Sequence, residues 1–139
     1  MSEAASATDE TTRGVRALVA GHGDFATGLV SAVEVITGQG KLLDALEVKT
    51  LCGDDIQVLL RTRLKESGAR VIFTDLQAGS CTMAARRLLR DTPGVVLVSG
   101  SNLPMLLEFV LSRATDPVEA ARAAVERGKN AMSVYGGAE

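Results

Sequence analysis

Short runs of apolar residues alternate along this chain with longer segments in which apolar residues recur at helical spacing. The short runs predict four β-strands, at residues 15–20, 46–51, 70–74 and 95–99. The fourth run is almost entirely apolar, which is typical of a strand buried on both faces of a sheet. The longer segments have the period of amphipathic helices, which would cover such a sheet.

Each longer segment carries signals for the start and stop of a helix. The predicted helices begin after Asp24, after Asp54 or Asp55, at Ser80, at Asn102 and at Asp116. The first two end at Gly38 and Gly68, the third ends at the turn 91–94, and the last ends at Gly128. Asp116, Pro117 and Glu119 have the order expected of a cap followed by a first helical turn.

The alternation of strands and helices predicts a doubly wound α/β fold. We expect a mostly parallel sheet in the order 2-1-3-4, with right-handed crossovers and with helices on both faces. Residues 129–135 are a candidate for a C-terminal edge strand. Residues 1–12 are small and polar, and we expect them to form a disordered N-terminal tail. Residues 13–139 would then form a single domain, in keeping with their number.

Composition narrows the classes of function. Of the 139 residues, 46% are hydrophobic, which is enough for a substantial core. The 15 basic and 17 acidic residues give a net charge of −2, which does not favour nucleic acid as a partner. No run approaches the roughly 20 apolar residues of a membrane span, and residues 1–12 lack the pattern of a secretion signal. We therefore expect a cytoplasmic protein that is not inserted in a membrane.

The order of the strands predicts where a functional site lies. In an open parallel sheet, ligands bind beyond the carboxyl ends of the strands, at the point where the strand order reverses. With the order 2-1-3-4, the first and third strands are neighbours at that point. His22, the only histidine of the chain, directly follows the first strand after Gly21, and Asp75 directly follows the third. We therefore expect His22 and Asp75 to meet in one crevice.

This pair suits phosphoryl chemistry. A neutral imidazole nitrogen is a nucleophile at neutral pH, and a carboxylate that accepts a hydrogen bond from the other ring nitrogen fixes the tautomer. Gly21 and Gly23 leave space for a partner to approach. The helices that begin near Asp24 or Phe25, and at Ser80, would direct backbone N–H groups towards a phosphate, with Gly23 and Gly79 as supporting residues of the phosphate site. Such a site requires no metal and no cofactor.

Simpler interpretations of the same residues remain open. Asp75, Ser80 and Asn102 are each typical of a residue that only caps a strand or a helix. Cys81, near a helix start, has either a lowered thiol pKa or an ordinary packing role. Arg86, Arg87 and Arg90 form either a solvated helix face or a docking patch for an acidic partner.

Three sequence blocks carry a resemblance to a known family. The first is 19–26, Val-Ala-Gly-His-Gly-Asp-Phe-Ala, followed by Gly28 and Leu29. The second is Phe73-Thr74-Asp75, followed by Gly79-Ser80 and Ala84-Ala85. The third is 99–108, Ser-Gly-Ser-Asn-Leu-Pro-Met-Leu-Leu-Glu. In this order and spacing, over about residues 15–130, they resemble the IIA components of mannose-family sugar phosphotransferase systems.

The resemblance implies a complete function. The histidine-containing phosphocarrier protein, HPr, would phosphorylate His22, which Asp75 would hold by a hydrogen bond. His22 would pass the phosphoryl group to a histidine of a IIB component, and IIB would phosphorylate sugar that enters through membrane IIC and IID components. The resemblance also implies a homodimer to which the C-terminal strand contributes.

Departures from the family pattern concern the identity of the sugar. Ala78 and Cys81 stand where Gly and Pro are common in the family, and the small residues of this block favour an amino-sugar branch such as N-acetylgalactosamine. One alternative is the phosphocarrier subunit of phosphoenolpyruvate-dependent dihydroxyacetone kinase, although Pro104 and Met105 favour the sugar branch. A receiver domain would need an acidic pair in place of His22. A purely regulatory module of the same fold is disfavoured by the presence of both His22 and Asp75.

Overall fold

A computed structural model describes residues 14–138 of the chain. Its centre is a sheet of four parallel strands in the predicted order, β2-β1-β3-β4. The strands are β1 (Ala17–Ala20), β2 (Leu43–Ala45), β3 (Val71–Thr74) and β4 (Val96–Val98). The expected N-terminal tail, residues 1–12, lies outside the described residues.

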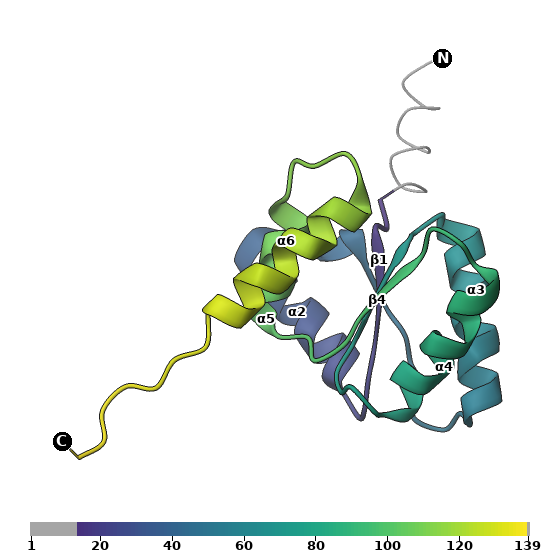
Figure 1. Ribbon diagram of the computed structural model, residues 1–139, viewed down its shortest axis with the longest axis horizontal. Coiled ribbons are helices and arrows are strands. Elements are labelled where there is room, and N and C mark those ends of the chain that lie inside the picture. The colour runs from purple at the N-terminus through teal and green to yellow at the C-terminus, as the bar shows by residue number, and fades with distance from the viewer. Residues whose placement is uncertain (1–13, 139) are drawn as a thin grey trace.

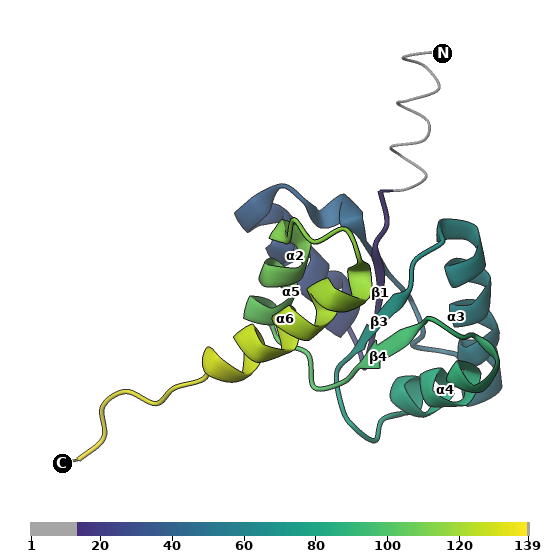
Figure 2. The ribbon, with the colours of Figure 1, turned by 45° about the horizontal axis from the view of Figure 1, so that its top comes forward.

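Helices cover both faces of this sheet (Figure 1, Figure 2). The helices are α2 (Phe25–Thr37), α3 (Gly53–Ser67), α4 (Ser80–Leu88), α5 (Leu103–Leu111) and α6 (Pro117–Asn130), with short 3-10 turns η1 (Gly40–Leu42) and η2 (Leu89–Asp91). Helices α2, α5 and α6 lie on one face, and α3 and α4 lie on the other. The doubly wound α/β fold is therefore confirmed. None of the helices in residues 14–138 is long and apolar enough to cross a membrane.

Two hydrophobic cores, one on each face, hold the layers together. Successive residues of a strand point to opposite faces, so β3 places Phe73 in one core and Ile72 in the other. The Phe73 ring packs edge-on against Phe109 of α5, with ring centroids 5.1 Å apart. On the opposite face, Ile72 shares a core with Leu60 of α3 and Leu88 of α4. Strands β1 and β3 are buried at every position because both faces are covered.

The second strand lies earlier in the chain than predicted. The apolar run at 46–51 indicated a strand, but β2 is Leu43–Ala45, which pairs with β1 from Ala17 to Val19. Leu46 and Val48 are nevertheless buried in the core beneath α3. The apolar pattern at 46–51 therefore indicates burial and not a strand, because β2 ends at Ala45.

Several predicted helix boundaries also shift. Gly38 and Gly68 end α2 and α3 with left-handed φ angles of 72° and 75°, as predicted. Helix α3 begins earlier than predicted, at Gly53, with Cys52 in the cap position. Gly128 does not end α6, which continues to Asn130.

The glycine at 128 serves close packing between two helices. A Cβ atom there would lie 2.9 Å from Met105 Cε and 3.0 Å from Asn102 Oδ1, both in or next to α5. The Asn102 side chain accepts a hydrogen bond from Met105 N–H and donates one to the Gly128 carbonyl. Asn102 therefore caps α5 and ties its start to the end of α6.

The C-terminal segment does not form the candidate edge strand within this single chain. Beyond α6, residues 131–138 contain no strand and extend away from the body of the molecule (Figure 1). Met132, Val134 and Tyr135 are exposed there.

Candidate active site

The register of the two central strands brings the predicted site residues together. Ala20, the last residue of β1, pairs with Thr74, the last residue of β3. The chain then continues into Gly21 and His22 on one side and into Asp75 on the other. Because the strands are parallel, these residues leave the same edge of the sheet, at the predicted point of strand reversal.

A paired contact joins His22 to Asp75. Asp75 Oδ2 accepts a hydrogen bond from the His22 backbone N–H at 2.7 Å and lies 2.8 Å from Nδ1 of the ring. We assign the ring proton to Nδ1, because an ionised carboxylate can only accept. Nε2 then carries the free lone pair. The His22 side chain is 58% exposed whereas that of Asp75 is 11% exposed, so the nucleophile faces outward from a buried support.

The same contacts determine the charge of Asp75. Burial alone would raise the pKa of this carboxyl group, but hydrogen bonds from the backbone and ring of His22 outweigh burial and hold the pKa below its usual 3.8. Asp75 is therefore ionised at neutral pH. Its second oxygen, Oδ1, is buried and has no hydrogen-bond partner among residues 14–138. A buried acceptor without a partner costs about 1–3 kcal/mol, and a catalytic role is one of the explanations for such a group in a native fold.

Two glycines allow this close arrangement. A Cβ atom on Gly21 would lie 2.8 Å from Asp75 Cγ and 2.6 Å from Phe25 Cδ2. A Cβ atom on Gly79 would lie 2.8 Å from His22 Cε1. Any larger residue at either position would therefore displace the imidazole or the carboxylate. Gly23, by contrast, is surrounded by open space and has a left-handed φ of 53°.

A polar hollow of about 130 Å³ lies beside the imidazole. Its lining residues come from both sides of the switch point: Gly21, His22, Gly23, Val48, Lys49, Leu51, Ser80 and Cys81. Helices α2 and α4 both begin at this edge of the sheet, but the first N–H group of α2, on Phe25, donates to the His22 carbonyl. The helix start available to an anion in the hollow is therefore that of α4, whose Ser80 and Cys81 line it. The hollow therefore combines a nucleophile, a helix start and a cation.

The cation is Lys49, which our sequence interpretation did not single out. Lys49 Nζ lies 2.5 Å from Asp24 Oδ1. The hydrogen bond and charge of this pair lower the pKa of Asp24 and raise that of Lys49. The predicted strand 46–51 had placed Lys49 inside the sheet. With β2 ending at Ala45, Lys49 lies in the loop beyond a strand end, where a site residue is expected.

The other predicted residues have distinct positions. Asp24 stands at the N-cap of α2 without making a side-chain cap, because its carboxylate pairs with Lys49. Phe25 is the first residue of α2, and its ring flanks Gly21 rather than the hollow. Gly79, not Ser80, is the N-cap of α4, so the Ser80 side chain is not occupied as a cap.

Two neighbouring residues have structural roles. Cys81 is buried beside the site, and burial together with the charge of Asp75 raises the pKa of its thiol to about 11, the opposite of a reactive cysteine. Thr82 fixes the loop that carries Asp75: its hydroxyl donates to the Leu76 carbonyl and lies 2.6 Å from the Thr74 hydroxyl. Over residues 14–138, no group of three or more His, Cys, Asp and Glu side chains is placed to hold a metal ion.

The fold and this geometry define a class: an α/β domain that presents one outward-facing histidine, oriented by a buried carboxylate, at the switch point of a parallel sheet. Residues 16–126 match the family described as PTS system fructose IIA component. The chain belongs to this family, the mannose-type IIA components of the sugar phosphotransferase system. The resemblance drawn from the three sequence blocks is confirmed.

Solved structures share the fold. The mannose/sorbose specific IIA subunit from Enterococcus faecalis has a TM-score of 0.79 and 23% identity, over 90% of this chain and 97% of that chain. The component EIIA from Streptococcus agalactiae has a TM-score of 0.77 and 22% identity, over 86% and 96%. A IIA protein associated with the fucose utilization operon of Streptococcus pneumoniae has a TM-score of 0.73 and 23% identity, over 85% and 90%. No curated protein gives a significant match to the chain.

Proposed function

We propose that this IIA component is a phosphoryl carrier in which Nε2 of His22 accepts a phosphoryl group from HPr and passes it to a histidine of a IIB component. One observation carries the proposal: Asp75 Oδ2 lies 2.8 Å from Nδ1, which leaves Nε2 as the exposed nucleophile. IIB would then phosphorylate sugar that enters through the membrane IIC and IID components, which are indirect partners of this chain. The cytoplasm, where HPr would meet the chain, is the proposed compartment.

Each transfer is an in-line exchange of one nitrogen–phosphorus bond for another. The Nε2 lone pair of His22 forms a bond to phosphorus as the bond to the donor histidine breaks, and the donor ring leaves with that electron pair. The His22 ring keeps its proton on Nδ1 and gains positive charge, which the Asp75 carboxylate offsets. Transfer to IIB is the same step with His22 as the leaving group. Catalysis is then mainly positioning and charge stabilisation.

The surroundings of His22 suit the charge of a phosphoryl group. A phosphoryl group is negatively charged, and it would be repelled by the carboxylates of Asp75 and Asp24. This repulsion is offset by positive groups nearby. Lys49 and the N-terminal N–H groups of α4 supply positive potential on the other side of the hollow, and the Ser80 hydroxyl is an additional donor. Gly23 leaves room for the partner's imidazole to approach.

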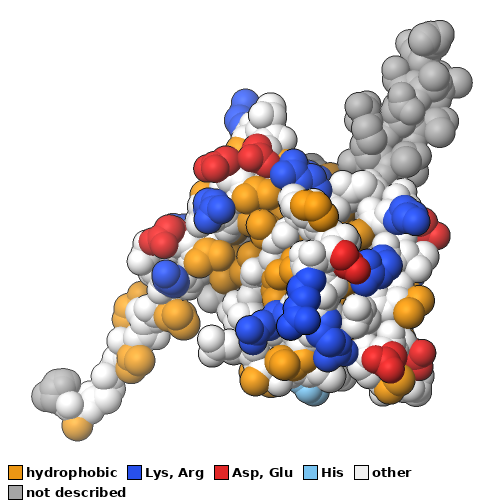
Figure 3. Space-filling view, turned by 45° about the vertical axis from the view of Figure 1, so that its right-hand side comes forward, with side chains coloured by type: hydrophobic (Ala, Val, Ile, Leu, Met, Phe, Trp, Pro, Cys, Tyr) orange, Lys and Arg blue, Asp and Glu red, His pale blue; other side chains and the backbone are white. Residues whose placement is uncertain are grey.

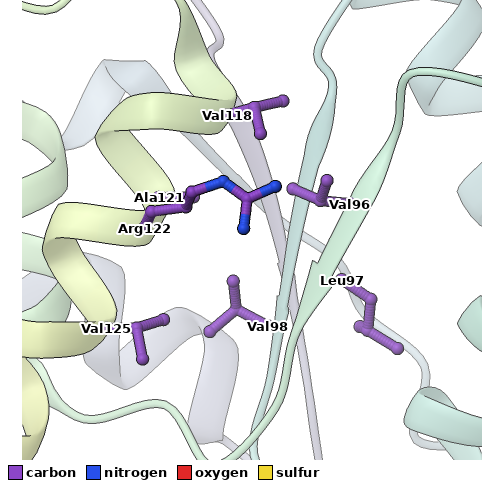
Figure 4. Close-up of a pocket in the computed structure, with 7 residues that line it drawn as sticks. All are labelled: Val96, Leu97, Val98, Val118, Ala121, Arg122 and Val125. Atoms are coloured by element: carbon purple, nitrogen blue, oxygen red, sulfur yellow. The ribbon is translucent and has the colours of Figure 1, made fainter.

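We further propose that residues 13–139 form one domain that assembles as a homodimer, to which the segment after α6 contributes. Strand β4 is at the end of the sheet, so within residues 14–138 its outer edge has no neighbouring strand. An apolar cavity of about 160 Å³ opens between β4 and α6, and Val96, Val98, Val118 and Val125 point into it (Figure 4). The exposed apolar residues of 131–138 are suited to cover such a surface on a second copy.

Mass spectrometry of the intact protein tests the carrier function. After incubation with phosphoenolpyruvate, enzyme I and HPr, the wild type should gain one phosphoryl group, which acid removes and base does not. The His22→Gln variant should gain none while retaining its fold, because the His22 side chain is mostly exposed. Normal labelling of this variant would contradict the assignment of His22, and a labelled group stable in acid would contradict a phosphohistidine.

A further inference from the structure

The buried polar side chains of residues 14–138 are gathered at one place. They are those of Thr74, Thr82 and Ser101, which are 0%, 2% and 9% exposed. Thr74 and Thr82 are joined through their hydroxyls, and the Ser101 N–H donates to the Thr74 carbonyl at 3.1 Å. Burying polar groups costs free energy unless they are hydrogen-bonded, so their concentration next to Asp75 indicates a specific role.

The hydrogen bonds of the two threonine hydroxyls have a defined direction. The Thr82 hydroxyl donates its one proton to the Leu76 carbonyl, because a carbonyl oxygen can only accept. The contact of 2.6 Å between the Thr74 and Thr82 oxygens must then use the proton of Thr74. Thr74 therefore donates to Thr82, and Thr82 donates to Leu76. We call the Thr74 and Thr82 hydroxyls the hydroxyl pair.

The hydroxyl pair closes a ring of contacts around the backbone of Asp75. Thr74 directly precedes Asp75 in the chain, and Leu76 directly follows it. Thr82 bridges these two neighbours, so a shift of the main chain at Asp75 would stretch or break one of its hydrogen bonds. The restraint acts on the residue whose Oδ2 must meet two N–H groups of His22.

Thr82 also links this carboxylate to the start of helix α4. It is the third residue of α4, and the two residues before it, Ser80 and Cys81, line the hollow beside His22. One side chain therefore fixes the spacing between Asp75, which orients the imidazole, and the helix start, which favours an anion. Such spacing matters, because a displacement of about 1 Å at a reacting centre can reduce a rate by about 100-fold.

A partner protein has no direct access to the hydroxyl pair. Figure 3 shows the one histidine side chain of the protein, in pale blue, at the surface, where a partner can reach it. Thr74 and Thr82 are enclosed in the fold. An effect of their hydroxyls on phosphoryl transfer must therefore act through Asp75 and His22, and not through the binding of the partner.

We infer that Thr74 and Thr82 are positioning residues for phosphoryl transfer. Their hydroxyl pair holds Asp75 in place, so that its carboxylate stays on Nδ1 of His22. The effect on transfer rests on the proposed function, whereas the effect on the His22 ring can be observed without it. Removing the hydroxyl pair should loosen the imidazole and slow transfer, while the affinity for the donor protein stays the same.

The test compares Thr82→Val, which has a similar shape but no hydroxyl, with Thr82→Ser, which keeps the hydroxyl. The matched control is Thr37→Val. The Thr37 hydroxyl likewise donates to a carbonyl, that of Val33 at 2.8 Å, and likewise accepts a hydrogen bond, from the Gln39 N–H at 3.0 Å. Thr37 is the last residue of α2, about 18 Å along the helix axis from the end that begins beside the site.

The variant Thr74→Val is a milder second test. It removes the bond from Thr74 to Thr82 and leaves the bond from Thr82 to Leu76. Because one contact of the ring remains, we expect Thr74→Val to lie between the wild type and Thr82→Val in every measurement. This variant also decides the inference if Thr82→Val does not fold.

Two measurements are made on each folded variant. Nitrogen-15 NMR of the His22 ring gives the share of the Nδ1–H tautomer before phosphorylation. Single-turnover transfer from phosphorylated HPr gives the maximal rate and the HPr concentration at half of that rate. We expect Thr82→Val to lower the Nδ1–H share and to lower the maximal rate about tenfold, with the half-maximal HPr concentration unchanged. Thr82→Ser and Thr37→Val should resemble the wild type in both measurements.

Several outcomes would overturn the inference. They are a wild-type tautomer share and rate in Thr82→Val, or in Thr74→Val where Thr82→Val does not fold, and a loss that Thr37→Val reproduces or that Thr82→Ser fails to restore. A weaker affinity for HPr at an unchanged maximal rate would also contradict it. If the wild type takes up no phosphoryl group from HPr, the proposed function fails, and the NMR measurement still decides whether the hydroxyl pair holds the carboxylate on His22.

Discussion

At the scale of single residues, the site depends on one carboxylate oxygen that is hydrogen-bonded to both the backbone and the ring of His22. This double contact fixes the ring more firmly than a single side-chain bond would. It also explains why the pKa of Asp75 is lowered despite burial, because ionised Asp75 is the form that both N–H groups favour.

The variant Asp75→Asn should slow phosphoryl transfer by about 10- to 100-fold, because the ring loses its charged orienting partner while the nucleophile remains. The measurement is the rate of single-turnover transfer from phosphorylated HPr. Transfer at the wild-type rate would remove Asp75 from the site.

The same variant gives a pH test. The pKa of Asp75 is lower in the folded than in the unfolded chain, so its charge stabilises the fold above about pH 4 and this stabilisation is lost as the pH falls further. The difference in unfolding free energy between wild type and Asp75→Asn should therefore narrow between pH 7 and pH 3 in urea titrations. A difference independent of pH would contradict the cause we assign to the lowered pKa.

Lys49 gives a second prediction at the same scale. Replacing it with Met removes the cation of the hollow and leaves Asp24 unpaired beside the phosphoryl group. The equilibrium between phosphorylated HPr and this chain should shift roughly two- to fivefold towards HPr, the size expected of a partly exposed charge pair. Mass spectrometry of equilibrated mixtures measures the ratio. Lys49→Arg keeps the charge, so its equilibrium ratio should stay near that of the wild type. An unchanged ratio for Lys49→Met would mean that Lys49 does not stabilise the phosphoryl group.

At the scale of elements, the sequence predicted most of the architecture and part of the site. Strand–helix alternation and left-handed glycines such as Gly38 are local signals, and the structure retains them. Because the meeting of His22 and Asp75 follows from strand order alone, it was also predictable. In a parallel sheet of this order, the expected position of a site is beyond the carboxyl ends of β1 and β3, where His22 and Asp75 lie.

The misplaced second strand and the misplaced end of α6 have related physical causes. Apolar residues report burial, and burial has more than one structural origin. Leu46 and Val48 are buried although they lie in a loop, so the second strand was predicted several residues after its true position. The predicted strand included Lys49, which was therefore not considered as a site residue. Gly128 reports a close contact with Met105 rather than a helix end. The errors at 46–51 and at Gly128 both concerned contacts between elements distant in the sequence, which no local pattern contains.

At the scale of the whole molecule, the open edge of β4 and the extended C-terminal segment predict a test of assembly. Deleting residues 131–139 should convert the proposed dimer to a monomer in analytical ultracentrifugation. His22 should still be phosphorylated, because the site residues all precede position 131. The point variant Val134→Asp, which places a charge on the same segment, should weaken the dimer in the same direction. A truncated chain that dimerises like the full chain would exclude this segment from the interface.

The loop that carries Asp75 is held by hydrogen bonds on both sides of that residue. Thr82 holds it through Thr74 and Leu76, and the Ser101 N–H donates to the Thr74 carbonyl. Because these bonds hold the backbone on both sides of Asp75, we expect the position of Asp75 to change little when His22 is phosphorylated. In a carrier of this kind, little of the free energy of the nitrogen–phosphorus bond would be lost in a conformational change while the phosphoryl group is on His22. Such a carrier would run equally well in both directions, so that the direction of sugar uptake is determined by the supply of donor and the removal of product.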